Sequence, residues 1–167
     1  ILEVLPAGGS LFASRVALGS DTLRLDQIAF TANTDSLDTS NAPGTLTLTG
    51  TDGARTVTLT WRFNPDSYRF DVSGTITGLG AIGGTMLLDL GNGFRDTEAN
   101  VGENHRESGI VTKLDKSSLK RFSQFKPREE EILTGPFEWV AVKSKYFVVG
   151  LFATDSLATQ GTPGRVS

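Results

Sequence analysis

The chain has little of two residue types, cysteine and histidine, that catalytic and metal-binding sites often use. Its 167 residues include no cysteine and one histidine, which excludes disulfides, thiolate metal sites and thiol nucleophiles. The 16 basic and 19 acidic residues nearly balance, at a net charge of −3. The chain therefore has no general attraction to nucleic acid or to an anionic membrane, and any partner must be recognised by a local surface.

Long apolar runs are also missing. None approaches the roughly 20 residues that a membrane-spanning helix needs, and the longest, Tyr146 to Ala153, suits a buried strand. The chain begins at Ile1 without a basic segment followed by an apolar one, so we expect a processed or excised piece that carries no signal peptide. With 38% hydrophobic and 21% charged residues, residues 1–167 are expected to form a single globular domain.

Short stretches of alternating apolar and polar residues dominate instead, and this period of two is typical of β-strands. We expect strands at Thr22 to Phe30, Thr45 to Thr49, Arg55 to Phe63, Ser67 to Ile76, Thr85 to Leu90 and Ser108 to Leu114. Asp52-Gly53 and Asn64-Pro65-Asp66 are turn signals. They predict that the second, third and fourth of these strands form a three-stranded meander.

The remaining segments predict little regular structure. Gly91 to Glu107 is polar and indicates a long surface loop. Between Asp115 and Glu131, Ser117-Ser118 could cap one or two turns of helix. Three apolar residues spaced by three favour that helix: Leu119, Phe122 and Phe125. The last residues, Leu157 to Ser167, indicate a polar tail.

Gly78 to Gly83 matches the glycine pattern of dinucleotide-binding sites. Such a site needs a helix that begins directly after the glycines, because the helix N-terminus holds the pyrophosphate. Only six residues separate Gly84 from Gly91, and the surrounding pattern is antiparallel β. We therefore interpret these glycines as a turn between strands and predict no cofactor.

His105, the only histidine, lies two residues after Glu103. One imidazole with a few carboxylates makes a poor metal site, and no serine lies in a Gly-x-Ser-x-Gly elbow. We interpret His105 as a solvated loop residue that could act in acid–base chemistry only if the loop lined a cleft. We predict no catalytic, metal-binding or cofactor-binding residue.

A basic stretch interleaved with phenylalanine superficially suggests a nucleic-acid patch. Its basic residues are Lys113, Lys116, Lys120, Arg121, Lys126 and Arg128. Glu129, Glu130 and Glu131 follow at once and cancel half of this charge. We therefore interpret the stretch as a solvated connection, anchored to the core by Phe122 and Phe125, and predict no nucleic-acid partner.

The run Gly135 to Phe152, GPFEWVAVKSKYFVVGLF, predicts two core strands joined by the polar turn Lys143-Ser144-Lys145. It resembles the segment W-[AV]-[AG]-V-K-x-K-Y-F in the periplasmic domain of YidC-type membrane protein insertases. Arg55 to Ile76 resembles the family's strand that is followed by Y-x-[FIL]-x-V, and Glu107 to Lys116 then leads into the hairpin. These pieces keep the family's order and spacing, so the resemblance covers residues 22–153.

The resemblance implies a mainly β fold, an antiparallel β-supersandwich similar to galactose mutarotase and related sugar-binding proteins, with little helix. It implies that residues 1–167 are the non-catalytic periplasmic domain of a longer, membrane-embedded protein of the Gram-negative inner membrane. The implied partners are the Sec translocon components SecD and SecF and nascent membrane proteins. The groove between transmembrane helices that serves insertion in the family lies outside this chain, so no functional residue is carried over and the binding residues stay unassigned.

Two other classes remain open. An aldose-epimerase-like enzyme would need His105 as acid and a carboxylate such as Glu103 or Glu138 as base, whereas the epimerase pattern relies on more than one histidine. A carbohydrate-binding module would use Trp61 or Trp139 as a stacking platform. Both tryptophans lie in alternating strands, where we first expect burial with the indole N–H hydrogen-bonded.

Overall fold

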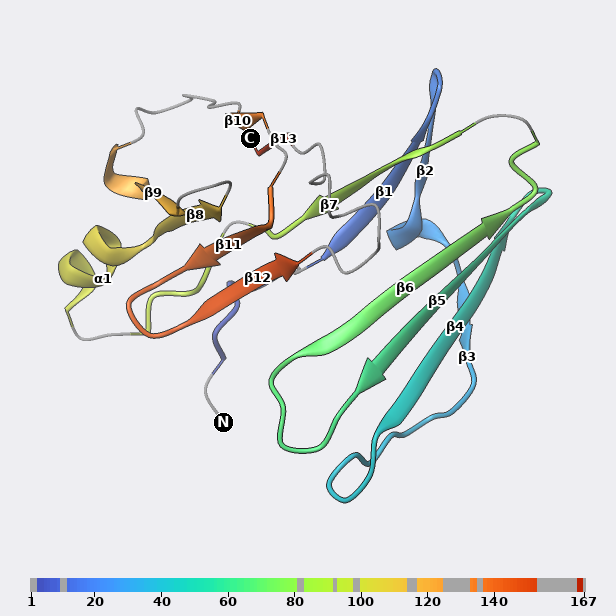
Figure 1. Ribbon diagram of the computed structural model, residues 1–167, viewed down its shortest axis with the longest axis horizontal. Helices are drawn as coiled ribbons and strands as arrows, with labels where there is room; N and C mark the ends of the chain where they lie inside the picture. Colours follow the sequence, from blue (N-terminus) through green and yellow to red (C-terminus); the bar gives the residue numbers. More distant parts are fainter. Residues whose placement is uncertain are drawn as a thin grey trace. The chain divides into compact units, whose positions relative to one another are not determined.

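A computed structural model describes residues 3–9, 12–80, 83–91, 93–97, 100–113, 117–124, 133–134, 137–152 and 165–166. Strands dominate, and every strand pairing between the described residues is antiparallel (Figure 1). The prediction of a mainly β fold with little helix is confirmed. The chain forms two compact units: residues 13–89, the sandwich unit, and residues 1–12 with 90–167, the helix-bearing unit.

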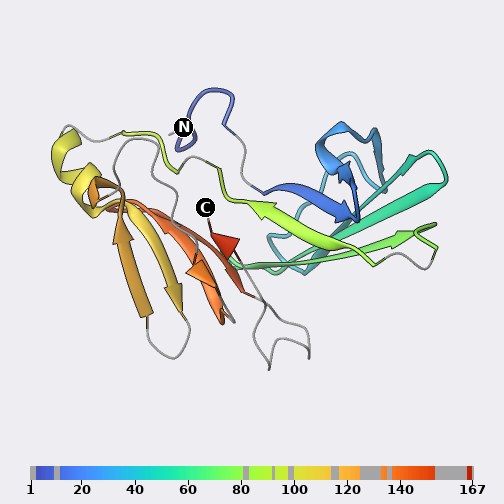
Figure 2. The same cartoon turned by 90° about the horizontal axis from the view of Figure 1, so that it is seen from above.

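Two sheets build the sandwich unit. Its elements are β1 (Ala13–Leu18), β2 (Asp21–Arg24), the 3-10 turn η1 (Leu25–Gln27), β3 (Phe30–Ala32), β4 (Gly44–Asp52), β5 (Arg55–Phe63), β6 (Phe70–Thr77) and β7 (Thr85–Asp89). The smaller sheet has the order β2-β1-β7 and the larger one β3-β4-β5-β6. The smaller sheet lies over one end of the larger, as two views show (Figures 1 and 2).

Alternation along the strands explains the core of this unit. On β5, Val57 and Leu59 share one face, while Thr56 and Thr58 point to the other, because successive side chains of a strand alternate. Val57 has no exposed surface. The smaller sheet and η1 cover it with four buried residues, Val16, Leu18, Leu23 and Leu25. At about 1.5–3 kcal/mol for each fully buried aliphatic side chain, this cluster is a major source of stability.

The predicted meander is confirmed. β4 and β5 pair from Asp52↔Arg55 to Gly44↔Phe63, and β6 continues the sheet from Phe63↔Phe70. Gly53 has a φ of 59° in the turn, a left-handed conformation that glycine adopts at little cost. Tyr68, predicted to alternate within the third strand, instead precedes β6 and is fully exposed.

The predicted strand Thr22 to Phe30 is wrong, because it breaks at η1. There the chain turns so that Leu25 enters the core, while Arg24 and Asp26 form an ion pair of 2.7 Å outside it. Strand β1, which the sequence did not predict, lies between β2 and β7. The core therefore depends on a strand and a turn that alternation alone does not reveal.

The described glycines of this pattern, Gly78, Gly80 and Gly83, lie between β6 and β7, as interpreted. Gly78 has a φ of 80°, and a Cβ atom at that position would clash with the carbonyl oxygen of Ala54. After the glycines the chain enters β7 at Thr85. A helix N-terminus, which a pyrophosphate site requires, does not follow at residues 83–89.

The helix-bearing unit contains one four-stranded sheet. Its elements are α1 (Val101–Glu107), β8 (Gly109–Lys113), β9 (Ser117–Arg121), the 3-10 turn η2 (Phe122–Gln124), β10 (Leu133–Thr134), β11 (Trp139–Lys143), β12 (Val148–Phe152) and β13 (Arg165–Val166). The sheet order is β12-β11-β8-β9, and β10 pairs with β13. The predicted hairpin is confirmed, with Trp139↔Phe152 and Lys143↔Val148 in register.

Three predictions fail in this unit. The loop predicted at Gly91 to Glu107 ends in helix α1, because Asn100 caps it: the side-chain oxygen of Asn100 accepts from the backbone N–H of Glu103 at 3.2 Å. The helix predicted between Asp115 and Glu131 is reduced to the 3-10 turn η2, since residues 117–121 form β9 against β8; Phe125 lies outside the described residues. The predicted tail includes β13, while residues 157–164 and 167 lie outside the described part.

Burial within the hairpin also differs from prediction. Trp139 and Phe147, expected in the core, are half-buried, whereas Phe137 is only 4% exposed. Among the described strands, β12 is at the edge of the sheet, and Phe152 on it is 59% exposed. Trp139 packs beside Phe152, with ring centroids 6.1 Å apart, and is therefore only half-buried.

Candidate docking surface

The structure places the residues that an epimerase-like mechanism would require in separate contacts. His105 lies on α1 and is exposed. Glu103 forms an ion pair with Lys145 at 2.9 Å, and Glu138 forms one with Lys113 at 2.7 Å. Among the described residues, no hydrogen bond or ion pair joins His105 to either carboxylate, and no three acidic or histidine side chains are grouped to hold a metal ion.

Asn104, the buried residue of α1, links the helix to the hairpin turn. Its side-chain NH₂ donates to Asp96 at 2.8 Å, and its side-chain oxygen accepts from the backbone N–H of Lys145 at 3.1 Å. Asn104 is 6% exposed, so these bonds satisfy a side chain that has little access to water. The helix and the turn are thereby held in one arrangement.

The charged turn residues strengthen this link. The Lys143 ammonium donates to the backbone carbonyl of Glu107 at 2.7 Å. The Lys145 ammonium hydrogen-bonds Glu103, which lowers the pKa of Glu103 and raises the pKa of Lys145, with their charge attraction acting in the same directions. Ser144, 5% exposed, accepts from the N–H of Phe147 at 3.1 Å. We call Glu103, Asn104, Glu107, Lys143, Ser144 and Lys145 the turn clamp.

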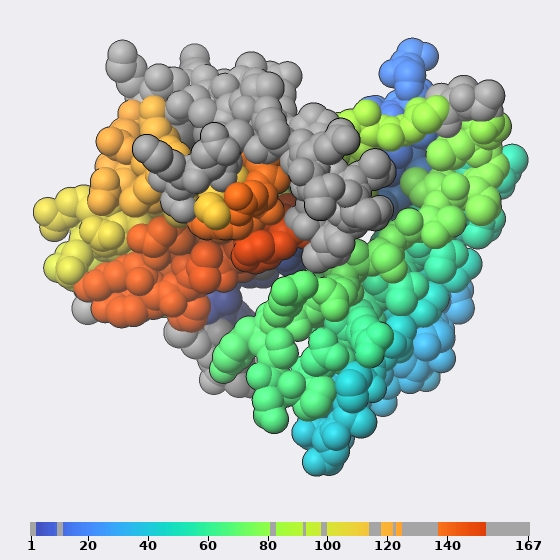
Figure 3. All heavy atoms as spheres, viewed as in Figure 1, coloured from blue at the N-terminus to red at the C-terminus, as the bar shows by residue number. Residues whose placement is uncertain are grey.

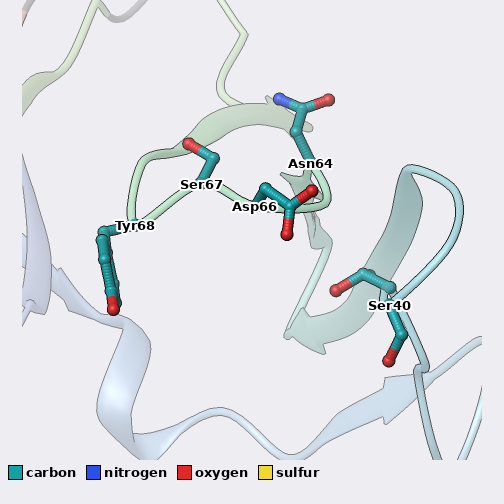
Figure 4. A pocket seen from close by; sticks show the side chains of 6 residues that line it. Ser40, Asn64, Asp66, Ser67 and Tyr68 are labelled. Carbon is teal, nitrogen blue, oxygen red and sulfur yellow. The ribbon is translucent and has the colours of Figure 1, made fainter.

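A polar hollow of about 460 Å³ lies at one end of the larger sheet (Figure 4). It is lined by Thr39, Ser40, Asn64, Asp66, Ser67 and Tyr68. Two of its hydroxyl groups are engaged within their own loops: Ser40 donates to Asp38 at 2.6 Å, and Ser67 donates to the carbonyl of Arg69 at 3.1 Å. The hollow therefore offers a ligand few free donors that are held in place.

An apolar surface extends beyond the core on the same face of the larger sheet. The core ends at Leu59 on β5, because the strands of the smaller sheet have four to six residues and β4 and β5 have nine. Beyond it lies the Trp61 face, which we define as Leu46, Trp61, Phe63, Phe70 and Val72. These residues are cross-strand neighbours, and Trp61 stacks on Phe70 with ring centroids 5.4 Å apart.

The Trp61 face is only partly covered. Val72 is 48% exposed, and the other four members are half-buried. At the far end, Leu37 lies over Gly44 so closely that a Cβ there would meet its Cδ1 at 2.7 Å. The surface is therefore a short apolar strip between the core and Leu37.

One polar group on this strip lacks a partner. The Trp61 indole N–H is buried and, within the described part of the chain, is the only buried side-chain polar atom without a hydrogen bond. The expectation of a hydrogen-bonded indole is therefore wrong for Trp61. Leaving such a donor unsatisfied costs about 1–3 kcal/mol, so this position is not explained by stability alone.

Comparison with known proteins decides the family. A sequence model of the YidC periplasmic domain matches residues 10–164, which include parts of both units. The chain belongs to the YidC periplasmic domain family. It is 32% identical over 123 residues to the membrane protein insertase YidC of Chlorobaculum tepidum, covering 66% of this chain and 20% of that protein.

Two further insertases agree. The YidC of Chlorobaculum parvum is 32% identical over 124 residues, covering 66% of this chain and 20% of that protein. The YidC of Chloroherpeton thalassium is 30% identical over 108 residues, covering 63% and 18%. The chain thus spans about a fifth of the length of the curated relatives it matches. No solved structure matches the chain significantly.

The segment that resembles the insertases has a structural role in this YidC periplasmic domain. Its Lys143-Ser144-Lys145 turn supplies half of the turn clamp, and Phe147 packs against Phe94 with ring centroids 5.9 Å apart. The Trp61 face was missed as a surface, although apolar alternation along β5 and β6 signals it. No helix among the described residues has the length and apolarity needed to cross a bilayer.

Proposed function

We propose that this YidC periplasmic domain is non-catalytic and supplies a docking surface on the periplasmic face of the inner membrane. The proposed partners are nascent membrane proteins or the Sec components SecD and SecF. The curated relatives are membrane protein insertases, which supports a role in insertion for the whole protein. The match of the family model to both units supports the proposal that they act together as one domain.

The observation that carries this proposal is the Trp61 face. It is an apolar strip with a 48% exposed valine and an unpaired indole N–H, and surfaces of this kind mark interaction sites more often than they serve stability. Within the described residues, neither His105 nor the polar hollow offers comparable chemistry. Contact should be local, because a net charge of −3 gives little long-range steering.

The test is site-specific photocrosslinking from the whole insertase in its membrane. A photoreactive residue placed at Val72 should crosslink to a nascent membrane protein, to SecD or to SecF. A matched probe at Thr75, also exposed on β6 but on the opposite face, should do so less. If probes over the whole exposed surface of the domain yield no crosslink to any of these partners, the docking function is wrong.

A further inference from the structure

We propose that the Trp61 face and the outer edge of β6 together bind an extended, uncharged apolar segment of another polypeptide, which adds to the sheet as a strand. The choice of a polypeptide rests on the proposed docking function. The site itself is argued from the sandwich unit alone.

Strand β6 exposes one edge of the larger sheet. β6 is the last strand of the larger sheet and pairs with β5 on one side only among the described strands. It has eight residues, six of them exposed, and its atoms form part of the surface in the space-filling view (Figure 3). Backbone N–H and C=O groups along such an edge can pair with an incoming strand.

The surface beside that edge is apolar. Val72 lies opposite Trp61 on β5, and Phe63 lies opposite Phe70, so the side chains next to an added strand would be apolar and carry no charge. Every second residue of the added strand would extend this apolar surface, since alternate side chains share a face. A sugar fits less well, because these five side chains offer it one N–H donor and no acceptor.

The indole N–H of Trp61 is the hydrogen-bond donor of this surface that lacks an acceptor among the described residues. The Trp61 N–H also has no access to water, so it can be satisfied only if a new acceptor arrives and the indole turns toward it. A polypeptide segment carries a carbonyl acceptor on every residue. An apolar segment thus supplies the two things that the Trp61 face lacks, which are a cover for its apolar side chains and an acceptor for the Trp61 N–H.

The distribution of charge on the larger sheet indicates which kind of polypeptide can bind. Arg62 and Asp71 lie on the other face of the sheet, because they are one residue out of phase with Trp61 and Val72. A charged side chain on the Trp61 face would lose water without gaining an ion partner from these five residues. The occupant is therefore a segment whose inward side chains are aliphatic or aromatic.

The test measures peptide binding to the 167-residue chain. The probe is a blocked peptide of eight alternating valines and threonines, with one lysine outside this stretch for solubility. Replacing Trp139 by phenylalanine leaves Trp61 as the only indole, so its fluorescence reports binding at this face. A peptide with the same side chains but alternate N-methylated amides is the control, because it removes the donors that strand pairing needs.

Two neighbouring variants locate the site. Val72→Lys places a charge on the Trp61 face, whereas Ser73→Lys places the same charge on the opposite face of the same strand, at a residue that is also exposed. We expect Val72→Lys to weaken peptide binding at least about tenfold and Ser73→Lys to change it less than about twofold. Equal effects, no binding at all, or equal binding of the N-methylated peptide would each overturn the proposal.

Trp61→Phe tests the donor while keeping an aromatic ring. Calorimetry should show about fivefold weaker peptide binding, with no loss of stability in urea, because the variant removes an unsatisfied N–H. Lower stability with unchanged peptide binding would mean that Trp61 is only structural and would overturn its role as donor. If peptides fail to bind but membrane crosslinks persist, this inference falls and the docking function stands.

Discussion

The turn clamp and the Trp61 face differ in whether their buried polar groups have hydrogen-bond partners. In the clamp, the buried side chains of Asn104 and Ser144 have hydrogen-bond partners. On the Trp61 face, a buried N–H has none, and apolar side chains remain half-covered. The clamp is a completed piece of structure that fixes a helix to a hairpin, whereas the face is explained better by a partner. The family motif and the proposed docking surface therefore belong to different units of the chain.

The largest effect is expected from a mutation in the core of the sandwich unit, which ends where the Trp61 face begins. Leu23→Ala should lower the free energy of unfolding by about 2–5 kcal/mol, because Leu23 is 3% exposed and its removal leaves a cavity against Val57. Urea unfolding measures the effect. Leu88→Ala on β7 of the same small sheet, 45% exposed, is the matched control and should cost about 1 kcal/mol or less. Equal losses would mean that the core is not where we place it.

The next largest effect is expected in the clamp. Asn104→Ala removes one donor and one acceptor and leaves the N–H of Lys145 without its side-chain partner, so it should cost about 1–3 kcal/mol. Hydrogen exchange should show that the amide of Lys145 loses protection before the strands of the sandwich unit do. A change in stability below about 0.5 kcal/mol would contradict the importance given to the clamp.

The ion pair of the clamp predicts a smaller, pH-dependent effect. The hydrogen bond from Lys145 lowers the pKa of Glu103, so the folded state favours the ionised carboxylate. Its contribution to stability is present above the ordinary pKa of glutamate and is lost as pH falls through the lowered pKa. Wild type should therefore exceed Glu103→Gln in stability at neutral pH, and the difference should vanish in acid.

Urea titrations at several pH values measure this difference. In a Lys145→Gln background, Glu103→Gln should have a much smaller pH-dependent effect, because the main partner is gone and only the attraction of Arg106 still lowers the pKa of Glu103. High salt should weaken the effect, since both side chains are partly exposed. An undiminished pH dependence without Lys145 would show that another group sets the pKa of Glu103.

Sequence patterns predicted the three strands β4, β5 and β6 of the larger sheet well because their signals are local. Alternation from Arg55 to Phe63 and the Asp52-Gly53 turn suffice for the meander. The break at Leu25 was not predictable, since it depends on a core formed with β1 and β5. Helix α1 had a local signal that was overlooked: Asn100 followed three residues later by Glu103 is a helix-start pattern.

The candidate surface was predictable only in part. The strands that hold Trp61 and Val72 were predicted from alternation, and their pairing places both side chains on one side of the sheet. Whether that side is covered depends on the length of the opposing sheet, and its central strand β1 was not predicted. The pairing of the Trp61 N–H likewise depends on three-dimensional neighbours. Alternation thus predicted the strands, whereas the shared face and the exposure of these side chains are known from the structure.

The smallest expected effect is at His105, next to the residue that anchors the clamp. His105 is exposed while Asn104 is buried, so His105→Ala should change stability by less than about 0.5 kcal/mol and leave peptide binding unchanged. Polarimetry with an aldose should show no mutarotation beyond the spontaneous rate for either protein. Catalysed mutarotation that disappears in His105→Ala would instead make this histidine an acid–base group, and the choice of a docking domain over an enzyme would have to be reversed.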